Sequence, residues 1–124
     1  RKACNLRLPF RVEPGYKLVV TQVLTEGSYS VEPRDRASLT REAFMVGSSL
    51  RKKDKINLRG SSSQLNFDNL IVPRPVVVES NCGQTNGMLG VSHIAQIIKS
   101  STKTTNSYID IFRAELQLQL VRCQ

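Results

Sequence analysis

Three cysteines and a single histidine are the residues whose types could support metal, redox or nucleophilic chemistry. Cys4, Cys82 and Cys123 stand one in each third of the 124 residues, so none has the CxxC spacing of a zinc knuckle. His93 alone cannot complete such a site, and we expect no metal and no cofactor. Dispersed cysteines in a short chain are typical of disulfides formed in an oxidising compartment, which predicts a secreted or cell-surface protein. Their odd number leaves one thiol without an intramolecular partner.

Catalysis by a nucleophile requires a base and a group that orients the base. His93 is in phase with the apolar Leu89 and Val91, so we interpret it as a core histidine rather than a catalytic base. The sequence contains no Gly-x-Ser-x-Gly motif, no phosphate-binding loop and no calcium loop. The carboxylates are dispersed, and those beside Arg or Lys, such as Asp35 and Asp54, are typical of solvated turn charges; Asp110, which shares a face with Tyr108 and Phe112 in the alternation, is the carboxylate of most interest. We therefore predict that the protein is not an enzyme.

Basic residues are the second chemical signal, with 18 Lys and Arg against 10 Asp and Glu and a net charge of +8. This balance favours a polyanionic partner, such as an anionic polysaccharide, although it also serves solubility. The chain has no Trp, 3 Tyr and 4 Phe, too few for stacking on single strands, so we do not expect nucleic acid. The candidate polyanion-binding residues form one cluster, expected in an exposed loop: Arg51, Lys52, Lys53, Lys55 and Arg59.

The elements that would position these residues are β-strands, because apolar and polar residues alternate with a period of two nearly everywhere. About eight strands separated by turn signals predict an all-β antiparallel sandwich, in a single domain spanning residues 1–124. Residues 16–25 and 27–32 are expected as two strands. Residues 38–46 fit a strand better than the alternative helix. No apolar run is long enough for a membrane span.

Turn residues mark the expected connections. Gly60–Ser63 is expected as a loop, Asn86-Gly87 has the sequence of a hairpin turn, and Pro73 and Pro75 indicate an extended joint before Val76–Val78. The first strand begins at Cys4 and the last ends at Cys123. If these two strands were antiparallel neighbours, a Cys4–Cys123 disulfide would tie the two ends of the domain together.

Several short motifs, in the same order along the chain, point to a known family. They are Arg-Lys-x-Cys at residues 1–4, Pro-Gly-Tyr at 14–16, Ser-x-Cys-Gly at 80–83 and Arg122-Cys123 at the end of the last strand, where the family has Arg-x-Cys. With these elements the chain resembles the fungal and bacterial family of small secreted proteins catalogued as domain of unknown function 4360.

The resemblance implies that a further segment, with another cysteine, precedes Arg1 in the precursor. On that basis we expect Cys4 to pair with Cys123 and Cys82 to pair with the upstream cysteine; pairing of Cys82 with Cys123 is the alternative. A sandwich that lacks strands from the upstream segment would also keep an open sheet edge, which a partner strand could cover.

Two functions from different classes remain. The first is a non-catalytic secreted structural or interaction protein that assembles through sheet edges, with another copy of itself or with a cleaved N-terminal segment as partner. The second is a cell-surface binding module for anionic polysaccharide or another polyanion. Salt dependence separates them, because polyanion binding weakens steeply with salt whereas strand pairing does not.

Overall fold

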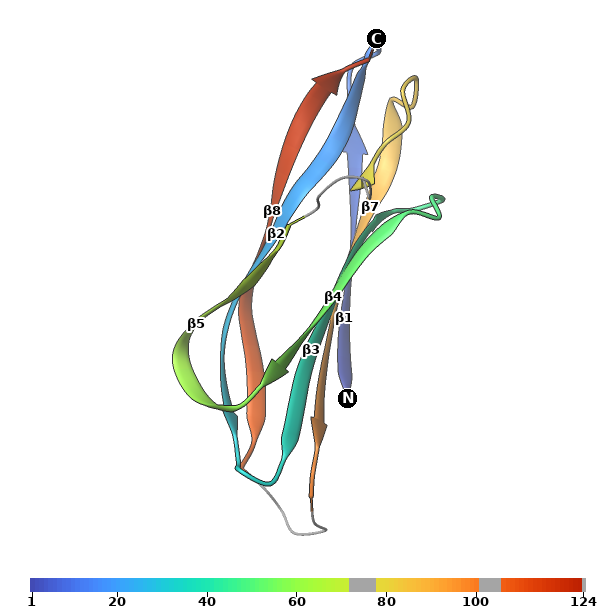
Figure 1. The fold of residues 1–124 in the computed structure, drawn as a ribbon. Helices are drawn as coiled ribbons and strands as arrows, with labels where there is room; N and C mark the ends of the chain where they lie inside the picture. The colour runs from blue at the N-terminus through green and yellow to red at the C-terminus, as the bar shows by residue number, and fades with distance from the viewer. Residues whose placement is uncertain (72–77, 101–105, 124) are drawn as a thin grey trace.

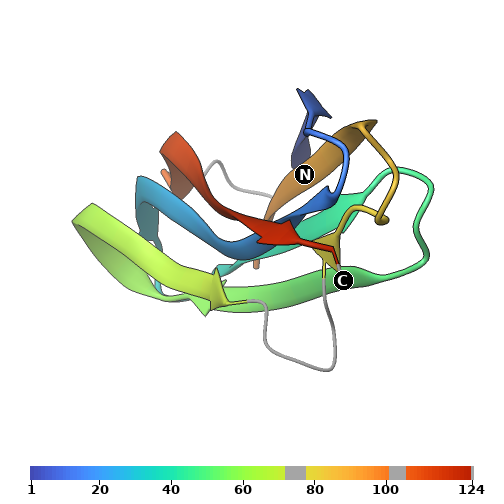
Figure 2. The same cartoon turned by 90° about the horizontal axis from the view of Figure 1, so that it is seen from above.

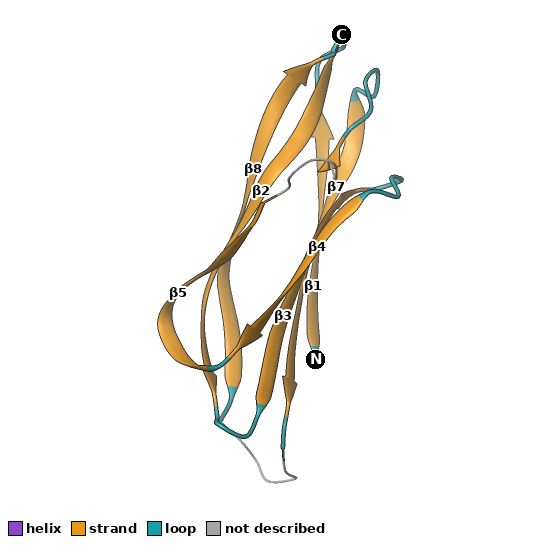
Figure 3. Ribbon diagram, viewed as in Figure 1, coloured by secondary structure: helices purple, strands orange, loops and turns teal. Residues whose placement is uncertain are grey.

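The computed structural model describes residues 1–71, 78–100 and 106–123, with only the backbone for residues 62–71. Eight strands and no helix make up this part of the chain (Figures 1 and 3). The strands are β1 (Lys2–Arg11), β2 (Tyr16–Val31), β3 (Arg36–Met45), β4 (Arg51–Leu58), β5 (Gly60–Ile71), β6 (Val78–Glu79), β7 (Asn86–Ile98) and β8 (Tyr108–Arg122). Within the described residues, no helix is present that could cross a membrane.

The strands form two antiparallel sheets that pack face to face. The first sheet has the order β1-β7-β3-β4. In the second sheet β8 lies along one side of β2, while β5 and β6 pair with different parts of the other side. Figure 2 shows β4 continuing into β5 on one side of the sandwich, with β1 and β8 on the other side. The prediction of a disulfide-stabilised, all-β antiparallel sandwich is confirmed.

The core between the sheets is built from the alternate residues of β2, β3 and β7. One apolar cluster contains Val20, Val23, Ala43, Met45, Val78, Leu89 and Val91. A second contains Val31, Ala37, Leu39 and Leu58. Along β3 the buried Arg41 stands between Leu39 and Ala43, and it separates the two clusters. The core is therefore divided by a polar layer, which the alternation of residue types did not predict.

Several expected boundaries differ from the structure. The strand expected at residues 38–46 is confirmed as β3, but the two strands expected at 16–25 and 27–32 are one continuous strand, β2. Two register shifts against β8 let β2 bend without ending, which explains why its alternation is interrupted. Gly60–Ser63 begins β5 rather than forming a loop, and Asn86-Gly87 begins β7. The expected joint at Pro73 and Pro75 lies outside the described residues.

The set of alternate β8 residues that points toward the core changes at a single residue. Glu26 of β2 pairs with Arg113 while Gly27 pairs with Ile111, so Phe112 has no partner and forms a bulge. Leu116 packs on one side of this bulge against the first apolar cluster, and Ile111 packs on the other side against the second. As a result Asp110 lies exposed, away from the core.

Candidate binding surface

The predicted basic cluster lies on strand β4 and not in a loop. Burial alternates along this strand, with Arg51, Lys53 and Lys55 exposed on the outer face of the first sheet. Lys52, between two of them, points to the inner side of the sheet and is partly buried. The expectation of a loop is therefore wrong. The neighbouring glycine and serines belong to β5, and long side chains with charged ends are well tolerated on an outer strand.

Other strands add basic residues to this face that are distant from the cluster in the sequence. Arg7 and Arg11 lie on the outer face of β1, and Arg36 begins the outer face of β3. On the outer face of the four described strands of the first sheet, Glu42 is the single carboxylate, and it is paired with Arg51. We call this surface the basic face: Arg7, Arg11, Arg36, Arg51, Lys53 and Lys55.

A phenylalanine fixes two arginines of the basic face. The guanidinium carbon of Arg51 lies 4.7 Å from the ring centroid of Phe44, and that of Arg7 lies 4.9 Å from the same centroid. These distances are typical of cation–π contacts. The ring lies across Gly90, where an added Cβ atom would come within 2.4 Å of it. Glycine at this position therefore lets Phe44 bring together arginines from opposite edges of the sheet.

Charges of both signs are mixed on the second sheet, and most of them form ion pairs. On its described strands, Lys17 Nζ lies 3.0 Å from Glu79 Oε2, and Arg113 Nη2 lies 3.2 Å from Glu115 Oε1. Arg113 also approaches Glu26, at 4.0 Å. The positive charge of the protein is thus concentrated on one of its two broad faces. A surface of one sign attracts ligands of the opposite sign.

His93 belongs to a polar cluster inside the sandwich. Its Nε2 lies 2.8 Å from the Thr25 hydroxyl of the opposite sheet, and Arg41 Nη1 donates to the same hydroxyl at 3.4 Å. Asp54 accepts two hydrogen bonds from Arg41, at 3.0 and 2.6 Å. His93, Thr25 and Arg41 are all buried. The interpretation of His93 as a satisfied core histidine is confirmed. We call this set of four residues the inter-sheet cluster.

The inter-sheet cluster should make stability depend on pH. Burial, and then the charge of Arg41, lower the pKa of His93 below its usual 6.5, while Asp54 acts in the opposite direction. The unfolded chain therefore binds a proton that the folded chain does not, so the free energy of unfolding should fall as pH decreases below 6.5. The expected slope is at most about 1.4 kcal/mol per pH unit.

Urea unfolding at a series of pH values between about 7 and about 5 measures this slope. His93→Gln, which keeps a hydrogen-bonding group facing Thr25, should flatten it. An equal slope in the wild type and in this variant would contradict the assignment to His93.

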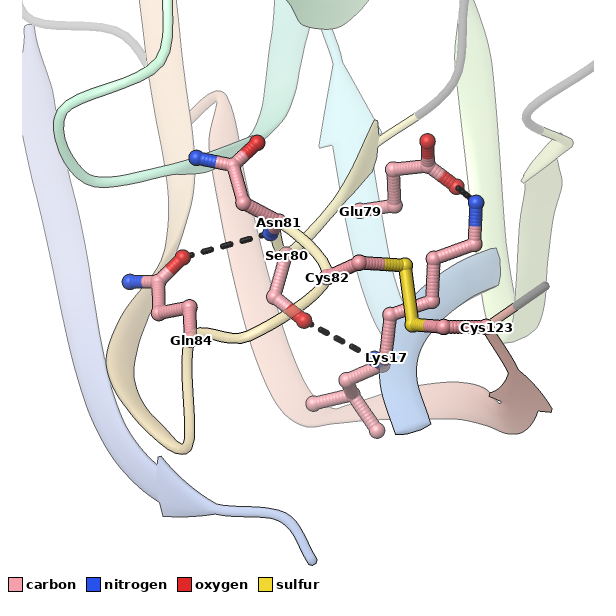
Figure 4. The surroundings of a disulfide bond; sticks show 8 residues. Lys17, Glu79, Ser80, Asn81, Cys82, Gln84 and Cys123 are labelled. Atoms are coloured by element: carbon pink, nitrogen blue, oxygen red, sulfur yellow. Dashed lines mark hydrogen bonds and ion pairs between the residues drawn. A yellow bond between two sulfur atoms is a disulfide. The ribbon is translucent and has the colours of Figure 1, made fainter. Parts of the chain in front are cut away.

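The disulfide joins Cys82 to Cys123, whose Cα atoms are 5.9 Å apart (Figure 4). The favoured pairing of Cys4 with Cys123 is wrong, and the alternative pairing is the one in the structure. The reason is topological. The first and last strands are not neighbours, because β1 pairs with β7 in the first sheet and β8 pairs with β2 in the second.

The segment that carries Cys82 is held by short-range contacts on β2. The Leu18 amide donates to the Ser80 hydroxyl at 2.9 Å, and the Ser80 amide donates to the Leu18 carbonyl at 2.9 Å. Gln84 closes the following turn by accepting from the Asn81 amide at 3.2 Å. Cys123 is placed by its own amide, which donates to the Gly15 carbonyl at 2.7 Å. These contacts bring the two cysteines together, as Figure 4 shows for the residues around Cys82.

Cys4 is a free, exposed thiol on β1, directly opposite His93 of β7 in the register. Arg59 completes the set of predicted residues. It follows β4 and lies at the end of the sandwich, beside Arg34 and Arg36, at a depression described below. Among the described residues, no group of acidic residues, histidines and cysteines is arranged to hold a metal ion.

The chain matches a known protein family. No curated protein matches the chain. The model of a family described as a domain of unknown function, DUF4360, matches residues 1–123, which is nearly the whole chain. It includes all three cysteines and the motifs on which the resemblance was based. The chain belongs to the DUF4360 family.

Proposed function

We propose that the protein is an exported, non-catalytic binding module that holds an anionic polysaccharide on its basic face. The single observation that carries this proposal is the segregation of charge. The outer face of the first sheet presents Arg7, Lys53 and Lys55, while on the described strands of the second sheet Lys17 and Arg113 are paired with acids. The Cys82–Cys123 disulfide supports export, because disulfides persist in oxidising compartments.

The repeated cations on this face suit a polymer better than a small ligand. Adjacent strands lie about 4.8 Å apart and residues on one face repeat about every 6.8 Å, which gives a regular array of cations. Phe44 holds Arg7 and Arg51 at fixed positions in one cross-strand row, so less side-chain entropy is lost when they bind an anion. Arginine guanidiniums also donate two parallel hydrogen bonds to carboxylate or sulfate groups.

Neutralising two lysines of the basic face should weaken binding about tenfold. Lys53→Gln with Lys55→Gln removes two contacts to the polymer, so the slope of log K against log salt should become smaller by about 1–2 units between about 50 and 200 mM salt. Calorimetric titration with a sulfated or uronate-rich polysaccharide measures both effects.

The matched control is Arg113→Gln with Arg122→Gln on β8, which lowers the net charge equally on the second sheet. It should leave both affinity and slope nearly unchanged. If both double variants lose affinity equally, binding depends on net charge alone and the assignment to the basic face is wrong.

Assembly of copies through sheet edges is a second candidate function, and the uncovered edge strands favour it. Strands β1 and β8 each pair on one side only among the described strands. The side chains that they turn toward the core remain partly uncovered: Leu6 is 37% exposed, Leu8 39%, Leu118 47% and Leu120 53%. Unpaired strands with apolar side chains are templates for a further strand.

Both uncovered edges belong to the same molecule, so β1 of one copy can pair with β8 of the next. Charge repulsion between them is limited, because β1 carries Arg and Lys but no acid, whereas Asp110 and Glu115 of β8 offset its two arginines. Light scattering should then show particles whose mass grows with concentration. Leu118→Lys with Leu120→Lys should yield monomers, while the control Gln117→Lys, on the opposite face of β8, should not. A monomer at every concentration would refute assembly.

A further inference from the structure

A depression of about 730 Å³ lies at the end of the sandwich opposite the disulfide, between two connections. The turn between β2 and β3 supplies one wall and the junction of β4 with β5 supplies the other. Its apolar floor is formed by Val31, Ala37 and Leu58, all buried members of the second core cluster. The volume lies in the range of small-molecule sites, which is about 300–1,000 Å³.

Three arginines line this depression: Arg34, Arg36 and Arg59. None of them forms an ion pair within the described part of the chain, in contrast to Arg41, Arg51 and Arg113. Each guanidinium has five N–H donors in a planar arrangement that matches carboxylate or sulfate oxygens. The lining therefore offers several cationic donors that the protein itself does not use.

The two carboxylates in the same lining are bonded elsewhere. Glu32 Oε1 accepts from the Asn106 amide at 3.0 Å. Asp35 Oδ2 accepts from the Ser107 hydroxyl at 2.6 Å, and Asp35 Oδ1 accepts from the Ser100 amide at 3.3 Å. These bonds turn both acids toward the chain that joins β7 to β8. The acids thus hold the turn in place, while the arginines remain available to a ligand.

The depression is continuous with the basic face. Arg36 is the first outer-face residue of β3, and Asn57 follows Lys55 on the outer face of β4; both residues also line the depression. A polymer lying along Lys53 and Lys55 would therefore reach the arginines at its end. The apolar floor with cationic donors around it suits a compact ring that carries one anionic group.

We propose that this depression is a binding pocket for one anionic sugar unit, a ring bearing a carboxylate or a sulfate, at the end of the polysaccharide held by the basic face. In naming the ligand, the inference rests on the proposed function. Arg34, Arg36 and Arg59 bind the anionic group, and the floor of Val31, Ala37 and Leu58 contacts the ring. The basic face binds any stretch of the polymer, whereas the pocket selects its terminal unit.

The test uses isotope-labelled protein titrated with four probes: a uronic acid disaccharide, a sulfated disaccharide, a neutral disaccharide and inorganic sulfate. The amide signals of Arg34, Arg36, Asn57 and Gly60 should shift with one or both anionic disaccharides. The one that binds identifies the anionic group. The double variant Arg34→Gln with Arg59→Gln should bind that disaccharide at least about tenfold more weakly. The neutral disaccharide should cause no shift, and sulfate should cause a weaker one, because it makes no contact with the floor.

The control Lys53→Gln with Lys55→Gln should bind the disaccharide as the wild type does, even though it binds the polymer about tenfold more weakly. Binding of polymer to the basic face without disaccharide shifts at these four amides would overturn the pocket and leave the proposed function standing. Disaccharide binding that needs Arg34 and Arg59, in a protein that binds no polymer, would support the pocket and overturn the proposed function. Equal binding of the neutral and anionic disaccharides would also overturn the inference.

Discussion

Replacing Cys82 and Cys123 together by serine should lower the free energy of unfolding by about 4 kcal/mol. The disulfide closes a loop with a sequence separation of 41 residues, and the chain-entropy relation for a loop of that length gives this value. The physical reason is that the bond restricts the unfolded chain, which otherwise gains more conformational freedom on unfolding. Urea unfolding, followed by far-UV circular dichroism, measures the loss.

Cys4→Ser is the matched control, because Cys4 is exposed and unpaired in the structure. It should change the free energy of unfolding by less than about 0.5 kcal/mol. Adding a reductant to the wild type should reproduce the effect of the double substitution. A loss of stability in Cys4→Ser that equals that of Cys123→Ser would instead indicate a Cys4–Cys123 bond.

Replacing Asp54, the acid of the inter-sheet cluster, by alanine should lower the free energy of unfolding by about 3 kcal/mol. Arg41 is 0% exposed, and Asp54 supplies its two shortest hydrogen bonds. Asp54→Ala leaves a buried cation whose remaining partner is the Thr25 hydroxyl, and breaking a buried pair in this way costs about 3–5 kcal/mol. The lower end applies because the Asp54 side chain is 29% exposed and water can reach the site. Denaturant unfolding checks this value.

Two further variants separate charge from packing at this site. Arg41→Met with Asp54→Leu removes both charges and should regain most of the stability lost in Asp54→Ala. Glu42→Ala breaks the exposed pair with Arg51 on the same two strands and should cost less than about 1 kcal/mol. If Asp54→Ala and Glu42→Ala had the same effect, burial of Arg41 would not be what makes its pair important.

The fold class could be predicted because it depends on local signals. Leucine alternates with polar residues over residues 115–120 of β8, and Leu89 and Val91 are spaced by two in β7; such spacing identifies strands with one buried face. His93 was correctly placed with Leu89 and Val91, because a period of two assigns a face without knowledge of the partner strand. Interruptions of the alternation are harder to interpret from the sequence. The bulge at Phe112 exchanges the faces of β8, and a residue skipped against β2 leaves no local signal.

The candidate site could be predicted only in part, for a related reason. Arg51, Lys53 and Lys55 are close in sequence, so their cluster was visible, but its placement on a strand required the pairing of β4 with β3. Arg7 belongs to the site because of cross-strand pairing: its partner Gly90 leaves room for the ring of Phe44, which contacts Arg7. Contacts between residues so distant in sequence follow from strand order, which no local pattern encodes.

Local patterns in the chain are thus enough to predict strands with one buried face, and composition alone gives the net positive charge. The tertiary structure decided which cysteines meet, since Cys82 and Cys123 are brought together by the pairing of β6 and β8 with β2. It also decided that Thr25, Arg41 and His93 converge between the sheets. Whether a residue is buried follows from its type and its spacing along one strand. Contact between distant residues depends on strand register and on how the two sheets stack, and register and stacking are set by the whole chain.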